Sequence, residues 1–198
     1  IKEEMTQLKG MIGMDRIKTS VMNQLLYFIQ NLGSGDAGNG DFKHTVICGP
    51  PGTGKTEIAK LIGKMYSKVG ILKNNVFKKV TRSDLIAGYL GQTAIKTNKV
   101  VTECIGGVLF IDEAPECGPG VLDSMRQPLE SGTITIARSI GNLTFPAQFL
   151  LVLAANPCPC GKFTGRGRNC TCTSQQVRRY LGKLSGPLMD RIDLRVQV

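Results

Sequence analysis

A glycine-rich turn at residues 49–56 carries the clearest chemistry in the sequence. It follows a short apolar run, Thr45–Cys48, and precedes a segment with helical periodicity, Glu57–Val69. Closely spaced glycines let backbone N–H groups converge on phosphate oxygens, and the helix behind them adds the positive end of its dipole. We expect Lys55 to reach the β- and γ-phosphates of a nucleotide and Thr56 to ligate Mg²⁺. The residues expected to bind the nucleotide are Gly49, Pro50, Pro51, Gly52, Thr53, Gly54, Lys55 and Thr56.

An acidic pair is the second candidate. Asp112 and Glu113 directly follow the apolar run Val108–Ile111. A strand that ends in a carboxylate beside a phosphate loop can hold Mg²⁺ through Asp112, and Glu113 can then polarise water for attack on the γ-phosphate. Acidic pairs are common on protein surfaces, so this prediction depends on the phosphate loop earlier in the chain.

Asn156 ends the apolar run Leu151–Ala155 and precedes Pro157. At that place its amide would lie between the phosphate loop and the acidic pair, where it could orient the attacking water. The alternative is an ordinary loop asparagine before a proline. We favour the catalytic interpretation because the other two motifs are present.

Four cysteines fall close together in the pattern Cys158-x-Cys160-x9-Cys170-x-Cys172. Four thiolates can hold one structural Zn²⁺ in tetrahedral geometry. The glycine-rich, polar residues between them have no apolar core of their own, so a metal would hold that loop together. Because Cys-x-Cys is a less usual spacing than Cys-x2-Cys, reduced free thiols remain the alternative.

The elements that must position these residues alternate between strand and helix, which predicts an α/β fold with a parallel sheet. The expected strands are Thr45–Cys48, Val76–Val80, Val108–Ile111, Phe149–Ala154 and Ile192–Val198. Helices are expected within residues 5–31, at Glu57–Val69, twice between Ser83 and Ile105, at Pro119–Glu130 and at Val177–Leu184. Residues 132–146 alternate like a β-hairpin that turns at Gly141–Asn142. A glycine-rich exposed loop is expected at residues 33–41.

Composition sets wider bounds. The chain of 198 residues is 41% hydrophobic and 20% charged, which excludes a wholly disordered protein. It has no apolar run of the roughly 18 residues that a membrane span needs and no signal peptide, so we expect a cytoplasmic protein without a membrane partner. The first residue is not Met, which indicates a fragment or an excised domain. The net charge of +10 favours a polyanionic partner, although nucleotide phosphates would also satisfy it.

These motifs together resemble the AAA+ ATPases, and the resemblance covers nearly the whole chain. It implies a single α/β core at residues 1–198 with a parallel five-stranded sheet of order 5-1-4-3-2, flanked by helices and carrying a β-hairpin insertion. It divides that core into an N-terminal helix and loop (1–40), a segment from the phosphate loop to the acidic pair (41–113), and a segment with the hairpin, the cysteine-rich loop and an arginine finger (114–198).

The family resemblance also implies a ring of identical subunits, often a hexamer, with nucleotide between neighbours. Ile12 and Gly13 match the segment that packs on adenine in this family. Arg191 matches the arginine finger given to the neighbouring site, although a surface or core-pairing arginine is the alternative. The family's helical lid, with its second sensor arginine, is absent, so this chain is expected to bind ATP weakly and hydrolyse it poorly.

The two halves resemble different AAA+ branches. Residues 10–113, through Ser83–Ala94 and Gly107–Glu113, look like the red-type Rubisco activase and stage V sporulation protein K group. In that group Tyr89 and Leu90 would form an aromatic pore loop that grips an extended polymer. Residues 112–198 look like the magnesium-chelatase-like ComM competence helicases. The motifs that carry this second resemblance are Asp112–Glu116, Leu122–Gly132, Ala154–Gly161 and Leu184–Asp193.

Basic residues change type where the two resemblances meet. Thirteen lysines and two arginines precede Glu113, whereas two lysines and eight arginines follow it. We therefore hypothesise a composite chain. The +10 charge is correspondingly weaker evidence for a nucleic acid, because it sums two unlike segments.

Three functions follow from these observations, and the first two share ATP hydrolysis with Mg²⁺. The first is a DNA translocase or branch-migration motor of the helicase type, whose hairpin could touch DNA near Arg138 or could be an ordinary surface hairpin. The alternative is a protein remodeller that acts on unfolded peptide through Tyr89 and Leu90. The third is a scaffold that binds nucleotide without turnover.

Overall fold

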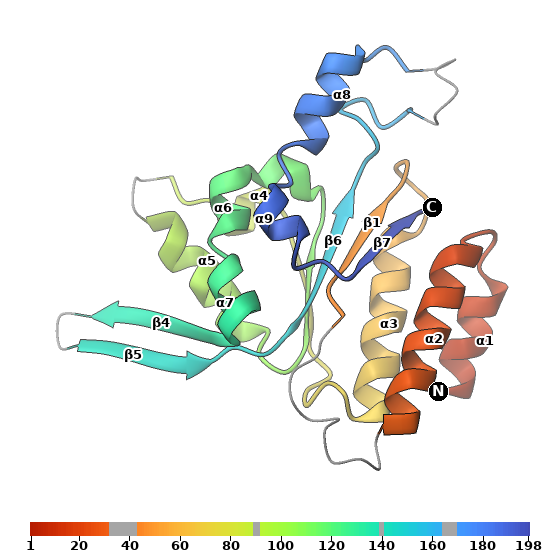
Figure 1. The fold of residues 1–198 in the computed structure, drawn as a ribbon, viewed down its shortest axis with the longest axis horizontal. Coiled ribbons are helices and arrows are strands. Elements are labelled where there is room, and N and C mark those ends of the chain that lie inside the picture. Colours follow the sequence, from red (N-terminus) through yellow and green to blue (C-terminus); the bar gives the residue numbers. More distant parts are fainter. Residues whose placement is uncertain (32–42, 89–91, 139–140, 164–169) are drawn as a thin grey trace.

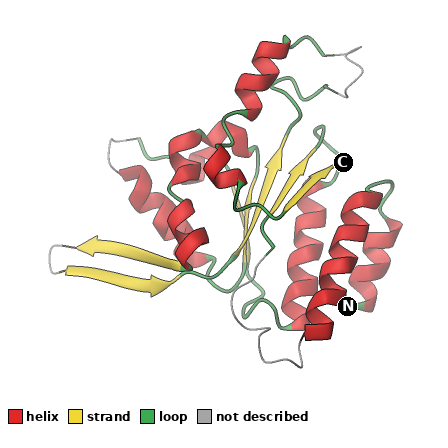
Figure 2. Ribbon diagram, in the orientation of Figure 1, coloured by secondary structure: helices red, strands yellow, loops and turns green. Residues whose placement is uncertain are grey.

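A parallel five-stranded sheet forms the centre of the molecule (Figures 1 and 2). The computed structural model describes residues 1–31, 43–88, 92–138, 141–163 and 170–198. The strands are β1 (Thr45–Cys48), β2 (Phe77–Val80), β3 (Val108–Ile111), β6 (Leu150–Ala155) and β7 (Leu194–Gln197). They lie in the order β2-β3-β6-β1-β7 and all pair in parallel. Counted along the chain this is the order 5-1-4-3-2, so the predicted fold class is confirmed.

Two helical layers cover the sheet. On one face lie α1 (Lys2–Gly10), α2 (Asp15–Asn31) and α3 (Lys55–Val69), which bury an apolar cluster against Ile47, Phe110 and Val152. The other face carries shorter elements around Leu109, Leu151 and Leu153. These are α4 (Arg82–Leu85), α5 (Gln92–Glu103), the 3-10 helix η1 (Ala114–Cys117), α6 (Pro119–Asp123), α7 (Arg126–Ser131) and α9 (Gly186–Met189). Strands β3 and β6 are buried on both faces, as their uninterrupted apolar sequences predict.

The helical pattern of residues 5–31 divides into two helices. Helix α1 ends at Gly10 and α2 begins at Asp15, because Gly13 and Met14 between them have positive φ angles of 70° and 64°. The segment expected at Pro119–Glu130 also divides. Pro128 has no N–H to donate to the Ser124 carbonyl four residues earlier, so α6 and α7 are separate.

The predicted hairpin is present as β4 (Thr133–Arg138) and β5 (Gly141–Pro146), and it reaches away from the sheet (Figure 1). Its turn differs from the prediction, since Gly141 and Asn142 already pair with Arg138 and Ala137 inside the strands. The connection is residues 139–140, outside the described residues. Buried Ile134 anchors the hairpin to the second helical layer.

Helix α8 (Ser174–Leu181) begins three residues earlier than its predicted start at Val177. The Thr173 side chain caps it and Gln176 completes the capping box, a pairing that ends the preceding loop at that point. The loop expected at residues 33–41 lies outside the described residues. Within the part of the chain that is described, no helix combines the length and the apolar character needed to cross a membrane.

Candidate functional site

The phosphate loop joins β1 to α3 and is shaped by two glycines in the left-handed region. Gly52 and Gly54 have φ angles of 78° and 81°, a conformation that other residues adopt only with strain. Gly54 is the residue that caps the N-terminus of α3, and Lys55 and Thr56 begin the first turn of that helix. The loop therefore brings its backbone to the positive end of a helix of 15 residues, as predicted for a phosphate site.

The Lys55 ammonium lies at the centre of the candidate site. Its Nζ donates to the carbonyl oxygens of Gly49 (2.7 Å) and Pro50 (2.8 Å) and to Oδ1 of Asn156 (3.3 Å). Burial lowers the pKa of Lys55, and the negative charge of Asp112 opposes that shift. The structure thus brings together Lys55, Asn156 and Asp112, which come from three neighbouring strand ends.

The acidic pair stands where β3 ends. The Asp112 backbone N–H donates to the Val80 carbonyl (2.9 Å), and its Oδ2 pairs with Nζ of Lys79 (2.7 Å). Glu113 follows with a φ of 51° and a ψ of 45°. A non-glycine residue in this conformation is strained, and such strain concentrates at functional sites. Glu113 is exposed and, with Glu116 and Arg82, lines a cavity of about 550 Å³.

The segment before α2 lies against the phosphate loop through methionines. The methyl groups of Met11 and Met14 lie 3.3 Å and 3.6 Å from the position that a Cβ on Gly54 would occupy. Ile12, predicted to pack on adenine, is 97% exposed, and Gly13 has a φ of 70°. The methionine contacts place this segment beside the loop, and the packing of Ile12 and Gly13 on adenine stays a prediction.

Arg191 makes its contacts within this chain to helix α7. Its Nη2 and Nε lie 3.1 Å and 3.2 Å from Oε1 of Glu130, and the arginine side chain is half-exposed. Among the ion pairs of the described residues, Arg191 pairs with Glu130 and not with Asp112 or Glu113. An exposed guanidinium held by a surface carboxylate is available to a neighbouring molecule.

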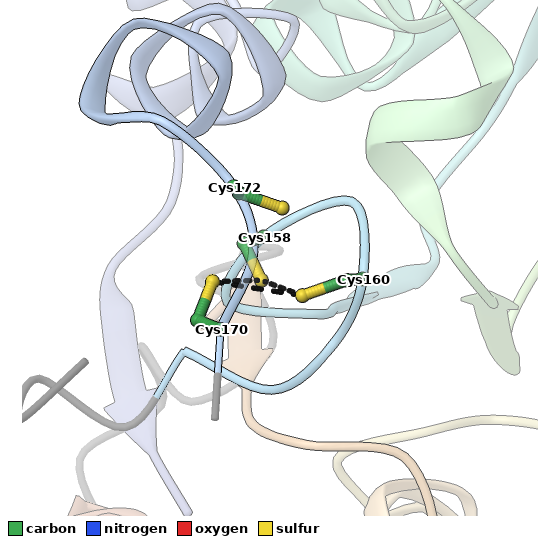
Figure 3. A group of neighbouring side chains, drawn as sticks. All are labelled: Cys158, Cys160, Cys170 and Cys172. Atoms are coloured by element: carbon green, nitrogen blue, oxygen red, sulfur yellow. Dashed lines mark hydrogen bonds between the residues drawn. The ribbon is translucent and has the colours of Figure 1, made fainter. Parts of the chain in front are cut away.

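The four cysteines converge, as their spacing predicts (Figure 3). Their sulfur atoms all lie within 4.8 Å of one another. The three closest pairs, among Cys158, Cys160 and Cys170, are separated by 3.3, 3.7 and 3.5 Å. Sulfurs bound to one zinc at about 2.3 Å would be about 3.8 Å apart, whereas a disulfide needs about 2.05 Å. The backbone N–H of Lys162 and then the Cys158 thiol lower the pKa of Cys160 to about 6.

One residue at this site has no motif in the sequence. Lys79 reaches Asp112 from β2. The available signal was a lysine one residue before the end of a strand pattern. The predicted pore-loop residues Tyr89 and Leu90 lie outside the described residues.

Residues 62–198 match the family described as magnesium chelatase, subunit ChlI. The chain belongs to this family. The match extends across Asp112 and Glu113, so the similarity is wider than the segment 112–198 from which it was expected.

Two relatives show how far the similarity of this ChlI-family chain extends. It is 38% identical over 174 residues to competence protein ComM of Haemophilus influenzae, which covers 77% of the chain and 34% of ComM. It is 37% identical over 118 residues to a putative cfxQ-like protein of Acanthamoeba polyphaga mimivirus, which covers 60% of the chain and 28% of that protein. The chain thus spans about a third of the length of the curated relatives.

A cryo-EM structure of Hsp104 with ATPγS and FITC-casein has the same fold. The TM-score is 0.61 at 21% identity, over 98% of this chain and 34% of Hsp104. At this identity the likeness concerns the fold alone. The fold and the family match both agree with the resemblance to AAA+ P-loop ATPases that the motifs indicated.

Proposed function

We propose that the chain is the ATP-binding and ATP-hydrolysing motor module of a ring assembly. The observation that carries this proposal is the contact of Lys55 with both the phosphate loop and Asn156, beside the carboxylates that end β3. In this proposal the loop N–H groups and Lys55 bind the β- and γ-phosphates of ATP. Asn156 orients a water molecule, and Glu113 takes its proton as the water attacks the γ-phosphorus. The bond from the γ-phosphorus to the bridging oxygen breaks, and ADP and inorganic phosphate are released.

Mg²⁺ fits the donor set. The Thr56 hydroxyl and the Asp112 carboxylate are hard oxygen ligands, and both stand at the phosphate end of α3 and β3. When bound, the ion would neutralise charge on the β- and γ-phosphates. Asp112 must then exchange its contact with Lys79 for the ion.

Glu113→Gln tests the assignment. The variant keeps the size of the side chain but lacks a basic carboxylate, so we expect ATP hydrolysis to be lost while ATP affinity stays within about twofold. Glu57→Gln, an exposed carboxylate paired with Lys60 on α3, is the matched control and should hydrolyse ATP normally. Unchanged hydrolysis in Glu113→Gln would refute Glu113 as the base, and failure of the unaltered chain to turn over would favour a nucleotide-binding scaffold.

The polymer that the motor acts on is proposed to be DNA, moved by translocation or branch migration. The similarity to competence protein ComM and the charge of +10 support DNA. The projecting β4–β5 hairpin, with Arg138 at the end of β4, is a suitable contact element. The alternative is a protein remodeller, which the cfxQ-like similarity and the Tyr89–Leu90 motif support.

The two proposed polymer substrates are distinguished by measuring how far forked DNA and unfolded peptide each stimulate the ATPase. DNA binding must weaken as salt rises, because phosphate contacts release counterions. Absence of DNA binding at low salt would exclude the motor on DNA. Peptide stimulation that disappears in Tyr89→Ala would instead establish the remodeller.

We further propose that Cys158, Cys160, Cys170 and Cys172 bind one structural Zn²⁺. The sulfur separations and the glycine-rich, polar sequence between Cys160 and Cys170 support it. Elemental analysis of the purified chain should give one zinc per chain, and Cys172→Ser should lower it. Cys104→Ala, at a buried cysteine outside the cluster, should keep the metal. Metal-free chain with four titratable thiols would instead indicate reduced free cysteines.

A further inference from the structure

The turn that carries the first two cysteines packs directly onto the phosphate loop. Its residues 158–161 follow the end of β6, and the Gly161 N–H donates to the Cys158 carbonyl (3.0 Å), which closes the turn. Gly161 has a φ of 73°, and a Cβ at this residue would lie 2.9 Å from Cδ and 3.3 Å from Cγ of Pro51. There is therefore no room for a side chain between the turn and Pro51.

The phosphate loop meets the same segment at a second place. Pro157 and Phe163, on the two sides of the turn, line a cavity of about 300 Å³ together with Gly49 and Pro50. Pro51 is exposed to solvent, so the turn limits the movement of its ring on one side. Any displacement of residues 158–161 is thus passed to the loop that is expected to hold the phosphates.

Two of the four cysteines belong to this turn. Cys158 is fully buried, and Cys160 immediately precedes Gly161. Their sulfur atoms lie within 4.8 Å of those of Cys170 and Cys172, which come from the segment before α8 (Figure 3). A zinc ion bound by the four sulfurs would therefore join the turn to that segment and fix the place of Gly161. Free thiols are only weak hydrogen-bonding groups and would hold the turn less firmly.

We propose that the turn 158–161 is a positioning element for the phosphate loop, and that zinc in the cysteine cluster strengthens ATP binding through the contact of Gly161 with Pro51. A fixed turn keeps the loop preorganised, so less conformational freedom is lost when the nucleotide binds. This inference rests on the proposed ATP and zinc sites and goes beyond both by linking them. Because such coupling is reciprocal, ATP must raise the affinity for zinc by the same factor.

Gly161→Ala tests the contact and keeps every cysteine. The methyl group must displace Pro51, whose ring atoms are fixed to the backbone, so we expect the dissociation constant for MgATP to rise about fivefold to tenfold. Zinc content should stay unchanged. Gly70→Ala is the matched control, because Gly70 has a φ of 84° at the far end of α3 and nothing lies within 4 Å of its Cβ position. It carries the same backbone strain and should bind MgATP normally.

A double-mutant cycle with Pro51→Ala separates this contact from general damage. Alanine lacks the Cγ and Cδ atoms that the new methyl group would meet, so Gly161→Ala should weaken MgATP binding far less in that background. An equal loss in both backgrounds would overturn the inference, as would normal MgATP binding by Gly161→Ala alone.

The link to zinc is measured in both directions on the unaltered chain. Removing zinc with a chelator under a reductant should raise the dissociation constant for MgATP about fivefold or more, and adding zinc back should restore it. Saturating MgATP should strengthen zinc binding by the same factor, measured by competition with a zinc-selective chelator. Lys55→Ala, which lacks the phosphate-binding ammonium, is the control, and MgATP should leave its zinc affinity unchanged.

The possible failures can be told apart. Equal MgATP binding with and without zinc would overturn the inference and leave both sites standing. A chain that binds MgATP but no zinc would refute the zinc site and the inference with it. A chain that binds zinc but no MgATP would refute the proposed motor function instead.

Discussion

At the scale of single residues, the candidate site contains strained backbone positions and a buried ammonium group. Met14 and Glu113 are the non-glycine residues with positive φ among those described, and each borders the candidate nucleotide site. The Lys55 ammonium is buried against carbonyl oxygens, where phosphate oxygens offer equivalent acceptors. These features are what a preorganised phosphate site requires, because the protein groups need little rearrangement when the anion arrives.

Lys79 adds a charge that competes for Asp112. The ion pair is partly exposed, with side-chain exposures of 46% and 25%, so its strength is about 0.2–1 kcal/mol. We expect Lys79→Met to lower the Mg²⁺ concentration for half-maximal ATP hydrolysis by about twofold to fivefold, because Asp112 no longer has to release an ammonium. A Mg²⁺ titration of the ATPase at fixed ATP measures this.

Lys78→Met is the matched control. Lys78 is the neighbouring residue of β2 and pairs with Glu103 instead of Asp112. Lys78→Met therefore removes the same charge from β2 without freeing Asp112. An equal shift in the two variants would show a general effect of net charge and would contradict the specific role of Lys79.

At the scale of elements, close approach between segments determines where the site residues stand. The chain enters β3 through Gly107, and a Cβ there would lie 2.5 Å from the Val76 carbonyl oxygen. The Gly107 carbonyl also accepts from the N–H of Leu150 (2.9 Å), so the backbone is fixed on both sides. The spacing of β2, β3 and β6, and with it the place of Asp112, depends on this glycine.

We therefore expect Gly107→Ala to lower the free energy of unfolding by about 2–3 kcal/mol, because the backbone must shift to accept the methyl group. Gly120→Ala is the control, since nothing lies within 4 Å of its Cβ position and it sits inside α6, where alanine is the better helix former. Urea unfolding of both variants, followed by circular dichroism, measures the difference. A stability of Gly107→Ala equal to that of Gly120→Ala would contradict the close packing described.

An element can be predicted from the sequence when its position is determined by residues close to it along the chain. Strands β1, β3 and β6 are short apolar runs bounded by glycine or polar residues, so their positions could be predicted from sequence. Strands β2 and β7 also contain charged or polar residues. The break before α2 and the gap between α6 and α7 depend on single backbone conformations at Gly13 and Pro128 within good helical patterns. The contact of Lys79 with Asp112 joins residues far apart in sequence, so no local pattern could indicate it.

At the scale of the whole molecule, the candidate site residues fall into two separate groups of contacts. Lys55, Asp112 and Asn156 gather at the carboxyl ends of the parallel strands, where α/β folds bind ligands. Arg191 is held by Glu130 on α7 instead. If Arg191 serves a neighbouring subunit, the contact between subunits is head-to-tail, which closes into a ring when the rotation permits.

This arrangement predicts complementation between two inactive variants. Arg191→Ala should bind ATP but lose most hydrolysis, because the charge that neutralises the transferring phosphoryl group is gone, and Glu113→Gln should lose it for lack of a base. In an equal mixture about a quarter of the interfaces would pair an intact Glu113 with an intact Arg191 from the neighbour. We expect the mixture to recover up to about that fraction of normal ATPase activity, measured after the subunits have exchanged. Activity would not recover if Arg191 acted within its own chain. Each variant measured alone gives the baseline ATPase activity.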